Sequence, residues 1–397
     1  MRILCLTNLY PNPYQPHRAP FNRQRLRLMN EQHPTRVIAP IAWTNEFRAR
    51  WAGARPLPSG RQVTLDGMII NHPRYYFPPR GFRGWYGRCF LGSVAGVFRR
   101  VVNEFRPDIV YTPWAYPDGW AAVQLARRVG LPVVLHVLGS DIRLLDRYPS
   151  KRGGTTEAVR TADGVVAVSQ ELAGRLRDLG VAPNKIRVIF DGVDSFVFHP
   201  GSCIKARTQV GVSGPGAVIL FVGNLVHVKG VDTLLAACHQ LRSSGLEFQV
   251  VVVGQGPLAP ALRDLVGRLG LSGSIRFTGS LPQGDLPDWY RAANVLVLPS
   301  RSEGVPNVLL EASACGTPWV ATSVGGIPEI AHLGASRVVP PDNPGLLAEA
   351  IRETLTTPPL RPATGPRSLT DAVAELAEFL ESVLHANLDG VQVGGSW

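Results

Sequence analysis

Short runs of aliphatic and β-branched residues alternate with helix-like segments along most of this 397-residue chain, and the series starts twice. The first series has runs at 3–7, 35–39, 108–111, 132–137, 164–168 and 186–189. The second begins at Ala217, with runs at 217–222, 248–253, 274–277, 294–298, 318–321 and 336–339. Strands that alternate with helices form mostly parallel sheets with helices on both faces. The sequence therefore predicts an α/β protein made of two Rossmann-like, doubly wound domains.

The domain boundaries are predicted from chain length and local composition. A chain of this length is too long for one ordinary hydrophobic core. We expect an N-terminal domain over 1–198, a Gly-, Ser- and Pro-rich linker over 199–216 and a second domain over 217–356. Residues 357–397 then hold a Pro-rich connector, an amphipathic helix at about 371–386 and a tail. No strand follows this helix, so it is expected to pack back on the N-terminal domain. The two sheets are expected to face each other across a ligand-binding cleft.

Positive charge is concentrated in the first half of the chain. Residues 1–200 contain 28 Lys and Arg against 14 Asp and Glu, whereas the remaining residues contain 13 against 16, and together they give the net charge of +11. This asymmetry predicts an anionic partner for the N-terminal domain alone. No apolar run is long enough to span a bilayer, and the five scattered cysteines show neither disulfide nor metal-ligand spacing. We therefore expect a cytoplasmic protein without a metal site.

The segment FVGNLVHVKG, residues 221–230, has the composition of an anion-binding loop. Gly223 ends a predicted strand, Asn224 follows it, and Lys229 precedes a predicted helix. Glycine lets backbone amides approach a ligand, a helix start offers unpaired N–H groups, and the lysine adds a full positive charge. This combination suits a diphosphate group. A tight turn with a solvated lysine fits the same residues, so the segment alone leaves both interpretations open.

Two glutamates, Glu303 and Glu311, flank the start of a predicted helix in SEGVPNVLLEASACG. Pro306 suits a first helical turn, which places Glu303 before the helix and puts Asn307 and Glu311 on one helical face. Small residues around Glu311 predict close packing, where an unpaired carboxylate costs several kcal/mol. Glu311 therefore needs hydrogen-bond donors, such as the vicinal hydroxyls of a sugar. A solvent-facing Glu311 is equally compatible with the spacing.

Residues 72–100 mix aromatic and basic side chains. The aromatic residues are Tyr75, Tyr76, Phe77, Phe82, Trp85, Tyr86, Phe90 and Phe98, and the arginines are Arg74, Arg80, Arg83, Arg88, Arg99 and Arg100. Such a mixture suits an anionic membrane interface. A helix with a buried aromatic face and a solvated basic face explains the composition equally well. Nucleic acid is a third interpretation, which no recognised binding motif supports.

Segments along most of the chain resemble the family 4 glycosyltransferases, retaining enzymes with the two-domain GT-B fold. They are YTPWAYPDGWAAVQLARRVGLPVV, GSDI, KIRVIFDGVDSFVFHP, FVGNLVHVKGVDTLLAA, VVVGQGP, IRFTGSLPQGDLPDWYRAANVLVLPS and SEGVPNVLLEASACGTPWVATSVGGIPEI, in this order. The likeness is most specific over 217–340 and is nearest to members that build bacterial surface polysaccharides. It implies the GT-B fold and a nucleotide diphosphate sugar as donor.

The resemblance also implies a role for each matching residue. Lys229 would contact the donor diphosphate, Glu303 would hold the donor sugar, and Glu311 would take the ribose hydroxyls. Asp141 of the GSD segment would face the sugar from the N-terminal domain. The other implied donor contacts are Gly223, Asn224, Gly279, Leu281, Gly304, Val305, Pro306 and Asn307.

Two positions depart from the usual family pattern. Many members have Arg where this chain has Asn224, which leaves Lys229 as the cation of the loop. Many have His where this chain has Leu138. His136 lies two residues earlier and points to the same side of a strand, so it is a candidate catalytic substitute. A buried structural histidine is the alternative.

These features predict a retaining glycosyltransferase that moves a hexose from a UDP- or GDP-linked donor to an acceptor hydroxyl. The expected acceptor is a lipid-linked or polysaccharide glycan at the inner face of the membrane, and no cofactor or nucleic acid is expected. Two alternatives stay open, and Asn224 and Leu138 make the first of them plausible. One is a non-catalytic subunit that binds a sugar nucleotide, and the other is a GT-B sugar-nucleotide epimerase.

Overall fold

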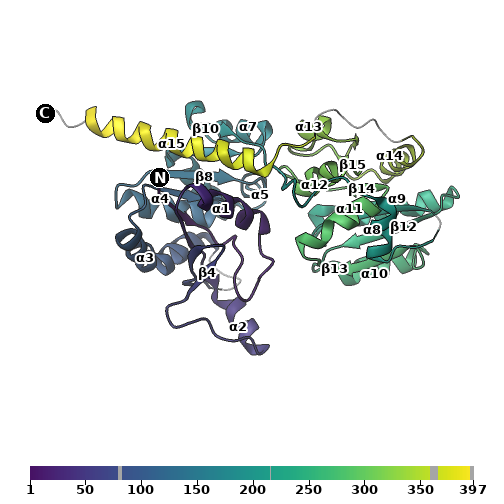
Figure 1. The fold of residues 1–397 in the computed structure, drawn as a ribbon, viewed down its shortest axis with the longest axis horizontal. Coiled ribbons are helices and arrows are strands. Elements are labelled where there is room, and N and C mark those ends of the chain that lie inside the picture. The colour runs from purple at the N-terminus through teal and green to yellow at the C-terminus, as the bar shows by residue number, and fades with distance from the viewer. Residues whose placement is uncertain (79–82, 215, 358–364, 394–397) are drawn as a thin grey trace. The chain divides into compact units, whose positions relative to one another are not determined.

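The computed structural model describes residues 1–78, 83–214, 216–357 and 365–393, apart from the side chains of Arg83 and of residues 389–393. The chain divides into two units (Figure 1). The first contains Met1–Phe190 together with the C-terminal residues from Thr370, and the second contains Asp191–Leu369. Within the described part of the chain, no helix is long and apolar enough to cross a membrane.

The first unit is built on an eight-stranded sheet that is parallel except for one edge strand. Its strands are, in spatial order, β10 (Ile186–Val188), β9 (Gly164–Ala167), β8 (Val133–Val137), β7 (Ile109–Thr112), β1 (Ile3–Leu6), β2 (Thr35–Ile38), β5 (Met68–Asn71) and β4 (Gln62–Leu65). The six strands predicted from the sequence are all present within one residue of their expected ends. The central strands are wholly buried because helices cover both faces.

Helices and one irregular excursion complete the first unit. The helices are α1 (Pro20–Gln32), α3 (Tyr86–Phe105), α4 (Trp120–Arg127), α5 (Ser140–Arg143), α6 (Pro149–Thr161) and α7 (Gln170–Asp178). Between β2 and α3 the chain also forms β3 (Ile41–Ala42), α2 (Trp43–Trp51) and β6 (Arg74–Tyr75), and β3 pairs with β6 in a separate two-stranded sheet. The sequence does not predict this excursion.

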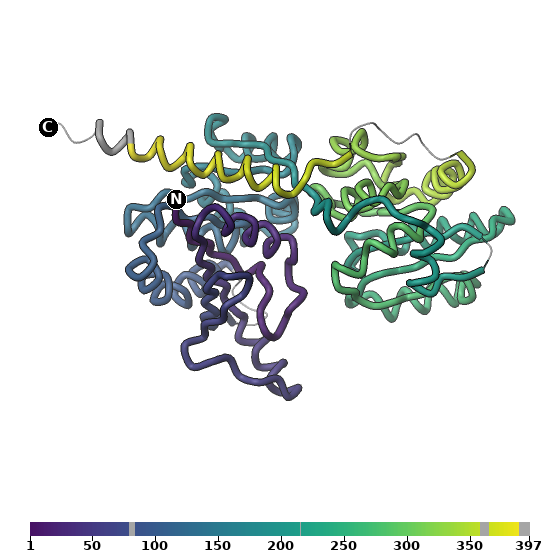
Figure 2. Tube along the Cα trace, in the orientation of Figure 1, coloured from purple at the N-terminus to yellow at the C-terminus, as the bar shows by residue number. Residues whose placement is uncertain are grey.

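The C-terminal helix α15 (Leu369–Val393) belongs to the first unit, as the sequence predicts. It runs beside the strands and helices of that unit (Figure 2). Phe379 and Val383 pack so closely on Gly164 of β9 that a Cβ atom there would lie 2.9 Å from each side chain. The Arg187 guanidinium lies over the Phe379 ring, 5.7 Å from its centroid.

The second unit contains a six-stranded parallel sheet. Its strands are, in spatial order, β13 (Ile275–Gly279), β12 (Phe248–Val253), β11 (Ala217–Val222), β14 (Val295–Leu298), β15 (Trp319–Thr322) and β16 (Ser336–Val339). Its helices are α8 (Cys203–Val210), α9 (Val231–Ser243), α10 (Ala259–Arg268), α11 (Leu286–Ala292), α12 (Asn307–Cys315), α13 (Ile327–Ile330) and α14 (Pro344–Thr356). The strand order reverses between β11 and β14, and ligands of such sheets bind beyond the carboxyl ends of the strands at this point.

The predicted linker over 199–216 differs from the structure. Helix α8 lies in this range, and Arg207 of α8 donates to the Ala292 carbonyl oxygen at 3.0 Å and to Asn294 Oδ1 at 2.6 Å. The unit boundary lies at Phe190 and Asp191 instead of at residue 198. Composition alone missed α8 because its buried contacts come from residues more than eighty positions away. The predicted connector includes 358–364, which lie outside the described residues.

The packing of α15 generates a stability prediction. Leu380 is fully buried on this helix, so Leu380→Ala should lower the free energy of unfolding of the first unit by about 2–5 kcal/mol. The exposed neighbour Glu378 supplies the control, since Glu378→Ala should change that free energy by less than about 0.5 kcal/mol. Urea unfolding of both full-length variants measures the difference. Equal unfolding midpoints would contradict the packing of α15.

Candidate functional site

The loop after β11 holds the predicted anion-binding residues of the second unit. The chain leaves the sheet at Gly223, passes the exposed Asn224 and forms a 3-10 turn over His227–Lys229 before α9 begins. Gly230 caps α9 with φ +64°, and a Cβ atom on it would lie 2.0 Å from the Pro299 carbonyl oxygen. Only glycine fits here, because the loop lies directly against the end of β14.

Lys229 and Glu303 form an ion pair between the loops that follow β11 and β14. Lys229 Nζ lies 2.6 Å from Glu303 Oε1, and Ser300 Oγ donates to the same oxygen at 2.6 Å. The Lys229 side chain is 21% exposed and that of Glu303 is 10% exposed. Two residues that the sequence predicts for one site therefore meet at the reversal point of the sheet.

The loops after β12 and β13 lie against the loop that carries Lys229. Gly254 donates its N–H to the Gly279 carbonyl oxygen at 2.8 Å, and a Cβ atom on Gly254 would lie 1.9 Å from the Gly223 carbonyl oxygen. The Gly-x-Gly of this segment is thus a tight turn packed on the Lys229 loop. Gly279 ends β13, and Leu281 is half-buried just beyond it.

Glu311 is buried on α12, and the protein itself supplies its hydrogen-bond donors. Tyr290 donates its hydroxyl to Glu311 Oε2 at 2.6 Å, and Gln283 Nε2 donates to Oε1 at 3.0 Å. Burial raises the pKa of the Glu311 carboxyl, whereas these two hydrogen bonds lower it. The solvent-facing alternative for Glu311 does not match this geometry. Contact with ribose stays a prediction.

Helix α12 begins without a side-chain cap. Pro306 occupies the N-cap position and offers no side-chain acceptor, and in the first turn of α12 the Leu309 N–H donates to the Pro306 carbonyl oxygen at 3.0 Å. Asn307 Oδ1 is buried and has no hydrogen-bond partner within the described part of the chain. Gly304 is held in place because its carbonyl oxygen accepts the Gly326 N–H at 2.9 Å, and Val305 is buried.

Asp141 and His136 belong to the first unit. Asp141 accepts N–H groups from Gly139 at 2.9 Å and from Ala115 at 3.2 Å, and burial raises its pKa to about 6. His136 lies within β8 at 1% exposure, with Nδ1 2.8 Å from the Tyr111 hydroxyl, and burial lowers its pKa well below the usual value. This geometry favours the alternative of a structural histidine, and the catalytic role of His136 stays a prediction.

Within residues 72–100, several aromatic side chains are buried and the arginines of α3 are exposed. Tyr75, Phe90 and Phe98 are buried, and the Tyr75 ring centroid lies 4.9 Å from that of Phe77 and 5.0 Å from that of Phe90. The arginines with described side chains on α3, which are Arg88, Arg99 and Arg100, are exposed. The structure thus favours a helix with a buried aromatic face and a solvated basic face. Arg80, Phe82 and the Arg83 side chain lie outside the described residues.

Comparison with known proteins identifies the family. Residues 26–195 match the family described as Glycosyltransferase Family 4, and residues 216–357 match Glycosyl transferases group 1. A D-inositol 3-phosphate glycosyltransferase of Catenulispora acidiphila is 31% identical over 320 residues, which cover 74% of each chain. One of Streptosporangium roseum is 34% identical over 330 residues, which cover 76% of this chain and 73% of the relative. This chain belongs to the glycosyltransferases of family 4 and group 1.

Solved structures of other glycosyltransferases share the fold. Sucrose-phosphate synthase from Thermosynechococcus elongatus aligns over 100% of both chains with a TM-score of 0.73 and 19% identity. Anabaena HepE in complex with UDP-glucose aligns over 99% of this chain and 100% of its own, with a TM-score of 0.69 and 18% identity. The predicted GT-B fold is therefore confirmed. The expected kinship with polysaccharide-building members stays a prediction.

Sequence reasoning missed three residues that shape the site of this glycosyltransferase. Tyr290 and Gln283 hold Glu311, and their role depends on contacts across more than twenty positions. Arg301 links the loop that follows β14 to the loop that follows β11. Its guanidinium donates to the His227 carbonyl oxygen at 2.6 Å and pairs with Asp232 at 2.7 Å. The available signal was the position of Arg301 two residues before Glu303.

Further contacts of Arg301 make it a positioning residue for Lys229. The Arg301 N–H donates to the Val228 carbonyl oxygen at 2.7 Å, and Arg301 Nε donates to Asp342 Oδ1 at 2.7 Å. The 3-10 turn that carries Lys229 is therefore fixed from the Glu303 loop. Arg301 itself touches neither Lys229 nor Glu303 through these bonds.

Arg301→Ala should weaken nucleotide diphosphate binding by about tenfold or more, because Lys229 loses its fixed position. Arg301→Lys should fall between Arg301→Ala and the unaltered enzyme, because lysine keeps the charge but lacks the planar fork. Arg337, which pairs with Glu353 at 3.0 Å elsewhere in the unit, supplies the control Arg337→Ala. Isothermal titration measures the affinity. Unchanged nucleotide diphosphate affinity in Arg301→Ala would show that the Arg301 hydrogen bonds are not needed to position Lys229.

Proposed function

We propose that this enzyme transfers a hexose from a UDP- or GDP-linked sugar to an acceptor hydroxyl with retention of the anomeric configuration. The observation that carries the proposal is the meeting of Lys229, Glu303 and the uncapped start of α12 at the reversal point of the sheet. The proposed acceptor is a lipid-linked or polysaccharide glycan. The proposed location is the cytoplasm, at the inner face of the membrane.

The diphosphate is the leaving group, so its growing negative charge must be stabilised in the transition state. Lys229 supplies a full positive charge for this purpose, and the first-turn N–H groups of α12 supply oriented dipoles. Asn224 carries no charge, so within this loop the electrostatic task rests on Lys229. Lys229 must exchange Glu303 for a phosphate oxygen when the donor binds, because their ion pair occupies the ammonium group.

The two glutamates hold the two ends of the donor in this proposal. Once Lys229 turns to the diphosphate, Glu303 is free to accept hydroxyl groups of the hexose. Glu311 accepts a ribose hydroxyl at Oε1 in place of the half-buried Gln283, while the buried Tyr290 keeps Oε2 fixed. Gly279 and Leu281 then lie beside the base.

The first unit contributes the acceptor side. Asp141 is proposed to act near the sugar, with its orientation set by the N–H groups of Gly139 and Ala115. His136 is enclosed in β8, and we propose that it acts only through its contact with Tyr111. A phosphorylated inositol is a second candidate acceptor, because the two relatives described above carry the name D-inositol 3-phosphate glycosyltransferase.

A screen of nucleotide diphosphate sugars by thermal unfolding tests the donor site. The correct donor at a hundredfold excess over its Kd should raise the melting temperature by about 5 °C or more. Lys229→Ala and Glu311→Gln should each abolish transfer and this shift while the protein stays folded. The exposed Lys205 on α8 provides the matched control, since Lys205→Ala should behave like the unaltered enzyme.

Undiminished transfer in Lys229→Ala or Glu311→Gln would refute the site assignment. Product stereochemistry, read from the anomeric proton coupling by NMR, tests retention, and an inverted product would refute it. Conversion of the donor sugar without any acceptor would identify the epimerase alternative. Donor binding with neither transfer nor hydrolysis would identify a non-catalytic subunit.

We also propose a peripheral association of the enzyme with anionic membranes through the basic face of α3. Arg88, Arg99 and Arg100 are exposed on this helix and attract anionic headgroups. Sedimentation with phosphatidylglycerol vesicles at low salt should succeed and should fail in high salt. A variant in which all three arginines are replaced by glutamine should lose this binding. Equal sedimentation with neutral vesicles would contradict the electrostatic basis.

A further inference from the structure

A cavity of about 500 Å³ lies in the first unit, on the excursion that the chain makes between β2 and α3. Helix α2 forms one wall and the residues of β6 and its continuation form the other. The cavity is lined by Trp43, Phe47, Arg50, Trp51, Arg74 and Tyr76, with Glu46 beside them. None of these residues is used by the proposed donor site. We call this feature the α2 cavity.

Aromatic side chains form one wall of the α2 cavity. Trp43, Phe47 and Trp51 recur at every fourth position of α2, so they lie on one face of the helix. Phe47 is 59% exposed and Trp51 is 84% exposed, and their ring centroids lie 6.0 Å apart. Trp43 is fixed because its Nε1 donates to the Phe77 carbonyl oxygen at 2.9 Å. An exposed aromatic stripe beside a cavity indicates a binding surface.

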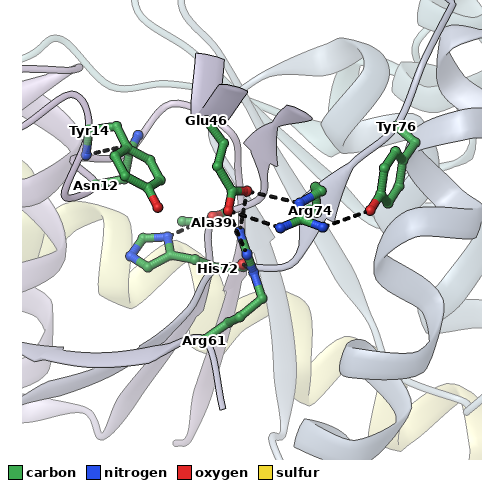
Figure 3. A network of polar contacts seen from close by, with 8 residues as sticks. All are labelled: Asn12, Tyr14, Ala39, Glu46, Arg61, His72, Arg74 and Tyr76. Carbon is green, nitrogen blue, oxygen red and sulfur yellow. Dashed lines mark hydrogen bonds and ion pairs between the residues drawn. The ribbon is translucent and has the colours of Figure 1, made fainter. Parts of the chain in front are cut away.

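Charged groups at the α2 cavity leave an excess of positive charge (Figure 3). Glu46 is buried and receives two hydrogen bonds from Arg61, at 3.0 and 2.9 Å, and two from Arg74, both at 3.0 Å. Arg74 also donates to the Tyr76 hydroxyl at 3.0 Å. One carboxylate thus offsets only one of two arginines.

Arg50 adds a further positive charge to the α2 cavity. Its side chain is exposed and makes no hydrogen bond or ion pair with other residues that the structure describes. Arg74 is rigidly held by Glu46, whereas Arg50 remains available for an anionic ligand group. The charge of the cavity therefore favours an anionic guest over a neutral or cationic one.

The α2 cavity lies beyond the carboxyl ends of the strands in the first unit. β3 and β6 continue from the ends of β2 and β5, and the Ile41 N–H donates to the Pro73 carbonyl oxygen at 2.9 Å. Asp141 follows β8 at the same edge of the sheet. β2 and β5 lie three and four strands from β8 in the spatial order, so these strands, beyond whose ends the cavity lies, are roughly 14–19 Å from β8. This distance suits different parts of one extended ligand.

Hydrogen bonds connect the α2 cavity with the Asp141 loop through residues 7–19. Asn45 of α2 donates to Gln15 Oε1 at 3.4 Å, and Arg18 donates to the same oxygen at 3.3 Å. Arg18 Nε also donates to the Asn8 carbonyl oxygen at 2.7 Å. Asn8 Nδ2 in turn donates to Asp118 at 2.9 Å. Figure 3 includes Asn12 and Tyr14 of the same loop in its view of the Glu46 cluster.

The irregular turn Ala115–Gly119 completes the connection. It carries Asp118, and its first residue, Ala115, donates its N–H to Asp141 Oδ2 at 3.2 Å. The α2 cavity and the Asp141 loop thus belong to one hydrogen-bonded edge of the sheet.

We propose that the α2 cavity is a subsite for an acidic oligosaccharide, the part of an extended acceptor that lies several sugar rings from the reacting hydroxyl. The proposal rests on the proposed function, because it assigns a chemical class to that acceptor. The C–H faces of sugar rings pack on Trp51 and Phe47, and a uronate carboxylate pairs with Arg50.

Equilibrium binding without donor tests the subsite. An oligogalacturonate hexamer should quench tryptophan fluorescence of the full-length enzyme, and the neutral maltohexaose should not. Trp51→Ala and Arg50→Ala should each weaken binding of the acidic hexamer by about tenfold. Both side chains are exposed, so the variants should keep the melting temperature of the unaltered enzyme. Trp85→Ala and Arg128→Ala, at exposed positions outside the cavity, are the matched controls.

Three outcomes would overturn the subsite. They are no binding of the acidic hexamer at millimolar concentration, equal binding of the neutral hexamer, and equal affinity in Trp51→Ala and Arg50→Ala. Binding of phosphatidylglycerol vesicles that is lost in these same two variants would assign the surface to membrane lipid instead. Lys229→Ala should bind the acidic hexamer normally, so a failure of the donor site is distinguished from a failure of the subsite.

Discussion

The ion pair between Lys229 and Glu303 depends on the parallel pairing of β11 with β14, which places the two following loops side by side. Neither charge is fully exposed, and a partly buried charge without a partner is costly. Each residue therefore compensates the other until a ligand replaces one of them. Arg301 adds further hydrogen bonds between the same loops and fixes the backbone of the turn that carries Lys229. In the proposed account the site is pre-organised, and the anionic donor competes with Glu303 for one ammonium group.

Glu311, one turn inside α12, likewise has protein partners for its charged group. Its carboxylate accepts hydrogen bonds from Tyr290, which is fully buried, and from Gln283, which is half-buried. One oxygen is thus held permanently, while the other has a partner that a ligand hydroxyl is able to replace. In the proposed account, Glu303 takes the place of the diphosphate and Gln283 the place of the ribose until the donor binds. Exchange of hydrogen bonds costs less than creating an unsatisfied group, which allows the site to stay buried without substrate.

The sequence predicted the two sheets and the loops that follow β11 and β14 because both depend on local patterns. Runs such as 217–222 are long enough to be buried strands, and Gly230 is required by its own backbone conformation. Helix α8, the α2 excursion and the roles of Arg301 and Tyr290 were missed because their contacts come from distant residues. Arg301 meets Asp232 across 69 positions, and such pairing leaves no periodic signal. For residues 72–100 the sequence revealed the aromatic and basic composition, but it did not reveal which side chains are buried.

A crystal structure of the enzyme with a bound nucleotide diphosphate tests the central claim most directly. In that complex Lys229 Nζ should lie within hydrogen-bond distance of a phosphate oxygen and no longer contact Glu303. Glu311 should accept a ribose hydroxyl in place of Gln283 and keep its bond with Tyr290. A nucleotide bound elsewhere, with the Lys229–Glu303 and Gln283–Glu311 contacts intact, would contradict the account of the donor site.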